Sequence, residues 1–123
     1  EVKTEPVLLG TGGGIRTALE SFGEEPFAVV NGDIICNAPL DRLHDQHVRS
    51  GAEVSLLLHD WPEFNNVAVS RDGFVLGFGK ETEKIRSEQN GVRMLAFTGI
   101  HFIGISLIIL LSSFRIVNGL IKE

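Results

Sequence analysis

The predicted fold is decided by the segment Pro26-Phe27-Ala28-Val29-Val30-Asn31-Gly32-Asp33. Its continuous apolar run at 27–30 is typical of a strand buried on both faces in a parallel sheet. Asn31-Gly32-Asp33 predicts a turn at the carboxyl end of that strand. Asp33 is suited to holding Mg²⁺ against a phosphate, because Mg²⁺ prefers one or two carboxylates together with phosphate oxygens. An aspartate in an ordinary turn is the alternative and the commoner situation.

On the amino-terminal side of this strand, a short strand end is predicted at residues 6–9. Gly10-Thr11-Gly12-Gly13-Gly14 then predicts a loop. A helix is predicted next, because apolar side chains recur at helical spacing from Ile15 to Phe22, and Gly23 is expected to end it.

On the carboxyl-terminal side, Pro39 predicts the first turn of a helix that Gly51 closes. An apolar strand is predicted over residues 53–59. Asp72-Gly73 lies between two strand-like runs within residues 67–78 and therefore predicts a β-hairpin.

The last third of the chain predicts three further segments. Residues 80–93 are charged and polar and predict an exposed loop, whereas residues 94–103 predict a strand. One or two helices are expected from Ser106 onward. Their apolar stripe would consist of Leu107, Leu110, Leu111 and Phe114.

Helices alternating with strands, with a hairpin inserted, imply an α/β layer fold with a mixed sheet. In open α/β sheets, ligands bind outside the carboxyl ends of the strands. The glycine segment 10–14 and the turn at Asn31-Gly32-Asp33 both follow strand ends. We therefore expect these two turns to share one binding site.

The glycine segment 10–14 is suited to nucleotide binding. Its four glycines among five residues let a base or a phosphate approach the backbone closely, and a helix N-terminus favours negative charge. It lacks the Gly-Lys-Ser/Thr ending of a P-loop and the last glycine of the dinucleotide-binding fingerprint. A flexible connector is the alternative.

The composition predicts one globular domain over residues 1–123. Hydrophobic residues make up 43% of the chain and charged residues 22%, which provides for a packed core. The formal net charge of -5 argues against general nucleic-acid binding, because phosphate backbones select clustered positive charge. A small anionic ligand remains compatible with it, because backbone N–H groups bind phosphate.

The compartment is predicted from Cys36 and from the amino-terminal residues. A single cysteine forms no intrachain disulfide, and no signal-type apolar core follows Glu1, so a reducing, cytoplasmic location is expected. The run from Leu95 to Leu111 is short for a membrane span and is interrupted by polar residues and glycines. We expect a buried strand and helix there, with a small membrane-associated protein as an alternative.

Other chemistry-bearing residues leave alternatives open. His44 and His47 lie three apart on a predicted helix, either as a metal pair or on a solvated face. Cys36 is either a reactive thiol or a small packed side chain. Lys80 is either a point charge for a phosphate or a solvated lysine. Residues 61–64 (Trp-Pro-Glu-Phe) are either a sugar-stacking rim or a loop anchored by its aromatic side chains.

Four segments, in this order, resemble sugar-1-phosphate nucleotidyltransferases (NDP-sugar pyrophosphorylases). Residues 9–15 resemble the family's LGT(A/G)GG segment, and residues 29–33 its VxNGD strand end. The hairpin at 66–78 and Phe97-Thr98-Gly99-Ile100-His101 resemble the following two segments. The glycine segment and Phe-Thr-Gly-Ile-His are most similar to mannose-1-phosphate guanylyltransferase-like or muramate-phosphate uridylyltransferase-like branches.

The resemblance implies a Rossmann-like nucleotidyltransferase fold with a mixed, mostly parallel sheet and helices on both faces, here incomplete. It implies Mg²⁺ and the reaction of an NTP with a sugar 1-phosphate to give an NDP-sugar and pyrophosphate. The site residues that it implies are, for the nucleotide, Gly10, Thr11, Gly12, Gly13 and Gly14; for the metal, Asp33; for the sugar, Asn66, Thr98 and Gly99; and for catalysis, Lys80. Lys80 stands in for the lysine of the family's EKP segment, although Glu81 follows it and no proline does.

The resemblance is incomplete at both ends of the chain. No GxGxRxxPLT…PK signature precedes Glu1, and the family's second metal-binding aspartate has no counterpart before Glu123. The chain is therefore expected to be a core fragment that binds nucleotide weakly and does not turn over alone. A strand edge exposed by truncation is expected to favour homo-oligomers. The alternative is a non-catalytic regulatory module of the same fold that binds nucleotides or NDP-sugars.

Overall fold

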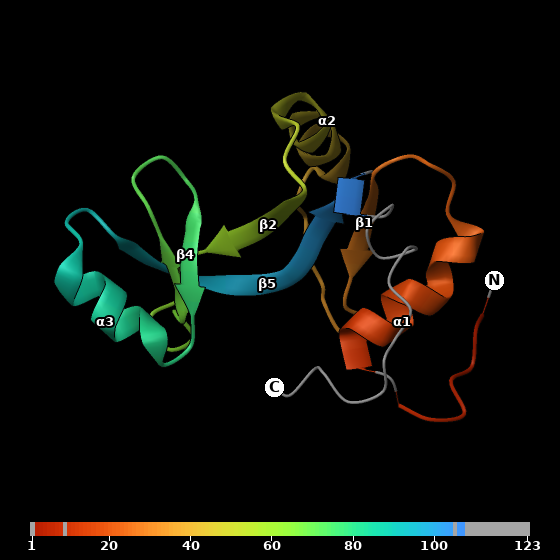
Figure 1. Cartoon of the computed structure of the whole chain (residues 1–123), viewed down its shortest axis with the longest axis horizontal. Helices are drawn as coiled ribbons and strands as arrows, with labels where there is room; N and C mark the ends of the chain where they lie inside the picture. The colour runs from red at the N-terminus through yellow and green to blue at the C-terminus, as the bar shows by residue number, and fades with distance from the viewer. Residues whose placement is uncertain (1, 9, 105, 108–123) are drawn as a thin grey trace. The chain divides into compact units, whose positions relative to one another are not determined.

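The chain is an α/β protein, as the sequence predicts, and its computed structural model describes residues 2–8, 10–104, 106 and 107 (Figure 1). In chain order the elements are α1 (Gly10–Ala18), a 3-10 turn (Leu19–Ser21), β1 (Phe27–Val30), α2 (Leu40–Ser50), β2 (Val54–His59), β3 (Val67–Val69), β4 (Val75–Phe78), α3 (Glu81–Glu88) and β5 (Arg93–Ile103). They form two compact units. The first holds the described parts of Glu1–Ala28, Pro39–Val54 and Phe102–Glu123, and the second holds Val29–Ala38 and Ser55–His101.

The sheet has the strand order β1-β5-β3-β4, and β2 pairs with β5. β3 runs antiparallel to both β4 and β5, so that Val67 lies opposite Phe78 on one side and Leu95 on the other. The arrows of β2 and β5 also point in opposite directions in Figure 1. The mostly parallel sheet that the family resemblance implied is therefore not found. A short apolar run looks the same in a parallel strand and in a central antiparallel strand, so the pattern leaves strand direction undecided.

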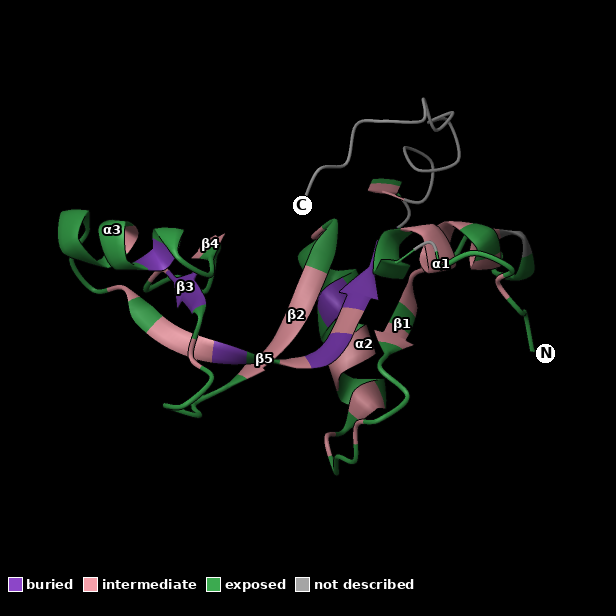
Figure 2. Cartoon of the chain, turned by 90° about the horizontal axis from the view of Figure 1, so that it is seen from below, coloured by how far each residue is buried: buried purple, intermediate pink, exposed green. Residues whose placement is uncertain are grey.

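The predicted hairpin is confirmed. β3 and β4 flank Asp72-Gly73. Gly73 has a φ of 88°, a left-handed conformation that glycine adopts readily. The Ser70 N–H donates to the Phe74 carbonyl at 2.8 Å and closes the turn. All three residues of β3 are buried, because strands lie on both of its sides and α3 packs on it (Figure 2).

Residues 81–88 form the helix α3, so the prediction of a loop throughout residues 80–93 was wrong. Glu, Lys and Arg are good helix formers, and Lys84 and Glu88 form an ion pair at 3.9 Å one turn apart. The side chain of Ile85 packs on β4, where an added Cβ at Gly77 would lie 2.6 Å from Ile85 Cδ1. The helix is polar on most sides, so it lacks the apolar periodicity from which helices are predicted.

Residues 10–14 lie in the first turns of α1, so the predicted glycine loop was wrong. Glycine adopts helical angles at an entropic cost, and glycine density alone does not exclude a helix. The Thr17 hydroxyl donates to the Gly13 carbonyl at 3.0 Å, and Lys3 Nζ donates to the Thr17 carbonyl at 3.1 Å. Among the described residues at 6–9, none is in a strand, and Val7 and Leu8 are exposed.

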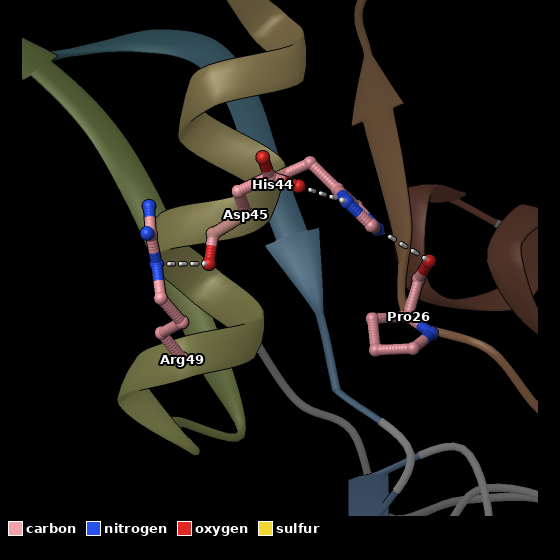
Figure 3. Close-up of polar contacts among 4 residues, drawn as sticks. All are labelled: Pro26, His44, Asp45 and Arg49. Carbon is pink, nitrogen blue, oxygen red and sulfur yellow. Dashed lines mark hydrogen bonds and ion pairs between the residues drawn. The ribbon is translucent and has the colours of Figure 1, made fainter.

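α2 begins after Pro39 and ends at Gly51, which has a φ of 64°, as predicted. His44 Nε2 lies 3.2 Å from the Pro26 carbonyl oxygen, and His44 Nδ1 lies 3.8 Å from a carboxylate oxygen of Asp45 (Figure 3). His47 is buried and stacks on Phe102, with ring centroids 5.9 Å apart. The alternative in which His47 lies on a solvated helix face is therefore wrong.

Acidification below about pH 6.5 is expected to destabilise the first unit. Burial lowers the pKa of His47 below its ordinary value of 6.5, and the charge of His44 lowers it further, against a hydrogen bond with the Ile103 backbone. Below pH 6.5 the unfolded chain therefore binds more protons than the folded chain. The free energy of unfolding keeps its full value above pH 6.5 and decreases as the pH falls through the pKa of the folded state. The thermal midpoint measured from pH 8 to pH 5 should therefore decrease.

His47→Gln is expected to flatten this pH dependence, because it replaces the buried imidazole with a side chain that does not titrate. Burial also lowers the pKa of His101, so a smaller slope should remain in the His47 variant. A wild-type slope in His47→Gln would contradict the prediction.

The apolar run at 95–111 begins in β5, as predicted, and no helix among the described residues is long and apolar enough to cross a membrane. The apolar stripe predicted after Ser106 lies largely outside the described residues.

Candidate functional site

A pocket of about 840 Å³ lies in the second unit, between α3, the end of β4 and the start of β5. Its lining combines amide, charged and apolar side chains. The lining residues are Pro62, Asn65, Asn66, Gly79, Lys80, Thr82, Glu83, Arg86, Val92 and Met94. Two residues that the family resemblance assigned to the site, Asn66 for the sugar and Lys80 for catalysis, are thus brought together.

Backbone hydrogen bonds hold Asn66 and Lys80 at the pocket. The Asn66 N–H donates to the Leu95 carbonyl at 3.1 Å, and the Asn66 carbonyl accepts from the Gly79 N–H at 2.8 Å. Gly79, with a φ of 60°, turns the chain from β4 into α3. The Thr82 hydroxyl donates to the Gly79 carbonyl at 2.7 Å and fixes this turn, which places Lys80 directly before α3.

Asn65 organises the loop on the other wall. Its Oδ1 accepts from the Trp61 N–H at 2.9 Å, and its Nδ2 donates to the Asp60 carboxylate at 2.7 Å. Trp61 packs edge-on against Phe64, with ring centroids 5.1 Å apart. These contacts support the alternative in which residues 61–64 form a loop anchored by its own aromatic side chains, and of these four residues Pro62 lines the pocket.

The pocket carries a local positive charge in a chain whose net charge is -5. Lys80 and Arg86 line it together with one carboxylate, Glu83. No ion pair among the described residues involves Lys80 or Arg86, whereas Lys84 on the same helix is paired with Glu88. Both pocket cations can therefore meet an anionic ligand.

A second pair of predicted segments meets where β1 ends. The Asn31 N–H donates to the Gly99 carbonyl at 3.1 Å, and the Ile34 N–H donates to the Asn31 carbonyl at 3.2 Å, which closes the turn that carries Asp33. Gly99 has a φ of 84°, and a Cβ there would lie 2.9 Å from Asn31 Nδ2. Only glycine allows this approach of β5 to the turn without strain.

Thr98 supports β5 through its hydroxyl. The hydroxyl donates to the Leu57 carbonyl at 2.8 Å and accepts from the Ile100 N–H at 3.3 Å. Gly99 therefore lies at the Asn31 turn and Thr98 is bonded to β2, and neither residue is among those that line the pocket. His101, two residues further on, has a pKa lowered by burial, and its Nδ1 has no hydrogen-bond partner among the described residues.

Asp33 is an exposed carboxylate in the Asn31 turn. Among the described residues, no three His, Cys, Asp or Glu gather where they could hold a metal ion by themselves. A single accessible carboxylate still fits Mg²⁺, which commonly keeps several waters and takes phosphate oxygens from a bound substrate.

The predicted nucleotide-binding residues, Gly10 to Gly14, belong to the first unit. Gly10 and Gly12 are exposed, and a Cβ at either would meet nothing within 4 Å. Because the first four N–H groups of a helix lack intrahelical acceptors, α1 presents donors along this segment.

Sequence reasoning missed Asn65, Thr82, Glu83 and Arg86 as pocket residues. Three of these lie on α3, which the pattern did not predict. Helical spacing would have indicated Thr82 and Arg86, because residues four apart lie on one face of a helix.

Two curated proteins are similar to this chain. The chain is 29% identical over 92 residues to a D-glycero-alpha-D-manno-heptose 1-phosphate guanylyltransferase from Aneurinibacillus thermoaerophilus, a match covering 73% of this chain and 39% of that protein. It is 34% identical over 92 residues to a mannose-1-phosphate guanylyltransferase from Mycobacterium tuberculosis, covering 72% of this chain and 26% of that protein.

No protein-family model matches the chain. The matched stretch spans well under half the length of either relative. Both relatives are named as sugar-1-phosphate guanylyltransferases, which supports the family resemblance identified in the four sequence segments: the chain is similar to sugar-1-phosphate nucleotidyltransferases.

Proposed function

We propose that the protein containing this chain transfers a nucleotidyl group from a nucleoside triphosphate to a sugar 1-phosphate, giving an NDP-sugar and pyrophosphate. The observation that carries the proposal is the meeting of Lys80 and Asn66 in one pocket, because the resemblance assigns Asn66 to the sugar and Lys80 to catalysis. The names of the two relatives favour GTP as the nucleotide.

The reaction joins two anions, and the chain supplies positioning and charge for it. A phosphate oxygen of the sugar 1-phosphate attacks the α-phosphorus of the triphosphate; the bond from that phosphorus to the bridging oxygen breaks, and pyrophosphate leaves. Lys80 places a positive charge at the sugar phosphate, and Asn66 offers an amide to the sugar hydroxyls.

Three further groups complete the proposal. The N–H groups in the first turn of α1, which lack intrahelical acceptors, would bind the nucleotide at residues 10–14, with glycine allowing close approach. Asp33 would hold Mg²⁺, which when bound neutralises phosphate charge. Thr98 and Gly99 would line the sugar, and the Gly99 carbonyl would also hold the Asn31 turn in place by accepting from the Asn31 N–H.

The test is product formation by the full-length protein. It is incubated with Mg²⁺, one nucleoside triphosphate at a time and a panel of sugar 1-phosphates, and the products are separated by ion-exchange chromatography. We expect an NDP-sugar and pyrophosphate in equal amounts, with GTP as the preferred nucleotide. Binding of nucleotides or NDP-sugars, seen as a raised thermal midpoint without any product, would instead support a non-catalytic regulatory module.

A further inference from the structure

We propose that Arg86 is the residue that makes the pocket selective for a phosphorylated sugar over the free sugar, by binding the phosphate together with Lys80. This inference deepens the proposed function and rests on it for the ligand class. It starts from Arg86, a residue on a helix that the sequence pattern did not predict.

The packing of α3 turns one row of its side chains to the pocket. Thr82 is buried, and Ile85 packs over Gly77, so these two residues fix the rotation of the helix on β3 and β4. Glu83 and Arg86 are three apart and line the pocket, whereas Lys84 pairs with Glu88 in another row. Arg86 is therefore set at the pocket by the fold of the helix.

The charges favour an anion that has one phosphate. Lys80 and Arg86 contribute two positive charges and Glu83 one negative charge, which leaves the lining positive in an acidic chain. Arginine presents a planar fork that matches a phosphate bidentately, and lysine acts as a point charge. The two cations are complementary in this respect.

The rest of the lining suits a sugar ring. Val92, Met94 and Pro62 offer an apolar surface to the C–H face of a ring, and the amides of Asn65 and Asn66 offer donors and acceptors to its hydroxyls. The pocket volume of about 840 Å³ lies within the range of small-molecule sites. All of these groups belong to one compact unit.

The experiment measures binding without any nucleotide. Isothermal titration calorimetry of the chain with mannose 1-phosphate, mannose and inorganic phosphate should show that mannose 1-phosphate binds tightest. Arg86→Gln should weaken its binding about tenfold, since a lost charge-assisted hydrogen bond has an effect of this order. The affinity of Arg86→Lys for mannose 1-phosphate should lie between those of the wild type and Arg86→Gln, because lysine keeps the positive charge but lacks the planar guanidinium.

Lys84→Gln is the matched control, because it removes a positive charge from the same helix at a residue outside the pocket lining. Its binding should stay within about twofold of wild type. Equal weakening by Lys84→Gln and Arg86→Gln, an unaltered affinity in Arg86→Gln, or no preference of the wild type for mannose 1-phosphate over mannose would each overturn the proposal. Unfolding curves confirm that each variant folds.

The outcome is separable from that of the proposed function. Selective binding that depends on Arg86, without NDP-sugar formation in the full-length protein, would sustain this inference and remove the nucleotidyl transfer. If the full-length protein forms an NDP-sugar but Arg86→Gln binds mannose 1-phosphate as tightly as the wild type, the proposed function would stand and the role of Arg86 would be wrong.

Discussion

Replacing Gly99 with alanine should destabilise the chain by about 2–4 kcal/mol and displace the turn that carries Asp33. Two effects add. An L-residue at a φ of 84° is strained by about 1–2 kcal/mol. The new methyl group would also lie 2.9 Å from Asn31 Nδ2 and 3.1 Å from Ile34 Cγ1, so both side chains would have to move. The free energy of unfolding from urea denaturation measures the sum.

Gly73→Ala separates the two effects. Gly73 has a nearly equal φ of 88°, but a Cβ there meets nothing within 4 Å. It should therefore cost only the backbone term of about 1–2 kcal/mol. The difference between the two variants measures the contact of β5 with the Asn31 turn, and equal losses would contradict that contact. Under the proposed function, Gly99→Ala should also lower turnover, whereas Gly73→Ala should not.

Asp33→Asn is expected to lower kcat of the full-length protein about 100-fold or more while leaving its stability nearly unchanged. The carboxylate is exposed, so its removal costs little packing. The amide has no negative charge for Mg²⁺, and removing one preorganised electrostatic contribution to a transition state costs about 10²–10³ in rate. The measurement is pyrophosphate release as a function of Mg²⁺ concentration.

Asp72→Asn is the control for this prediction, because Asp72 is also an exposed carboxylate, in the hairpin turn. It should retain wild-type turnover and the wild-type Mg²⁺ dependence. Wild-type turnover in Asp33→Asn would remove Asp33 from the proposed metal site, and an equal loss in Asp72→Asn would point to a general charge effect.

The turns were the most predictable part of the fold. Gly51 at the end of α2 and Asp72-Gly73 in the hairpin both lie in the structure where the sequence places them. Each depends on a local rule: glycine alone readily takes a positive φ, so its position marks the turn. The strands β1, β2 and β5 were also predicted from the sequence, because their runs of apolar residues are bounded by polar segments.

Errors occurred where local preference was ambiguous. The segment Gly10–Gly14 is compatible with either a loop or a helix, and the structure has it in α1. The polar segment that became α3 gives little periodic signal, because a helix held by Ile85 and Thr82 needs only a narrow contact face. Strand direction was missed because hydrophobic burial does not depend on it.

By itself, the sequence determined the α/β class, the positions of most strands and turns, and the candidacy of Asp33 and Lys80 for a phosphate site, because these follow from local backbone preferences and side-chain chemistry. The candidacy of Asn66 for the sugar came from the family resemblance alone. Only the tertiary structure decided the antiparallel strand pairing and the joining of Asn66, Lys80 and Arg86 around one pocket. The physical reason is that strand pairing and helix packing depend on contacts between residues far apart in the chain, and no local pattern specifies them.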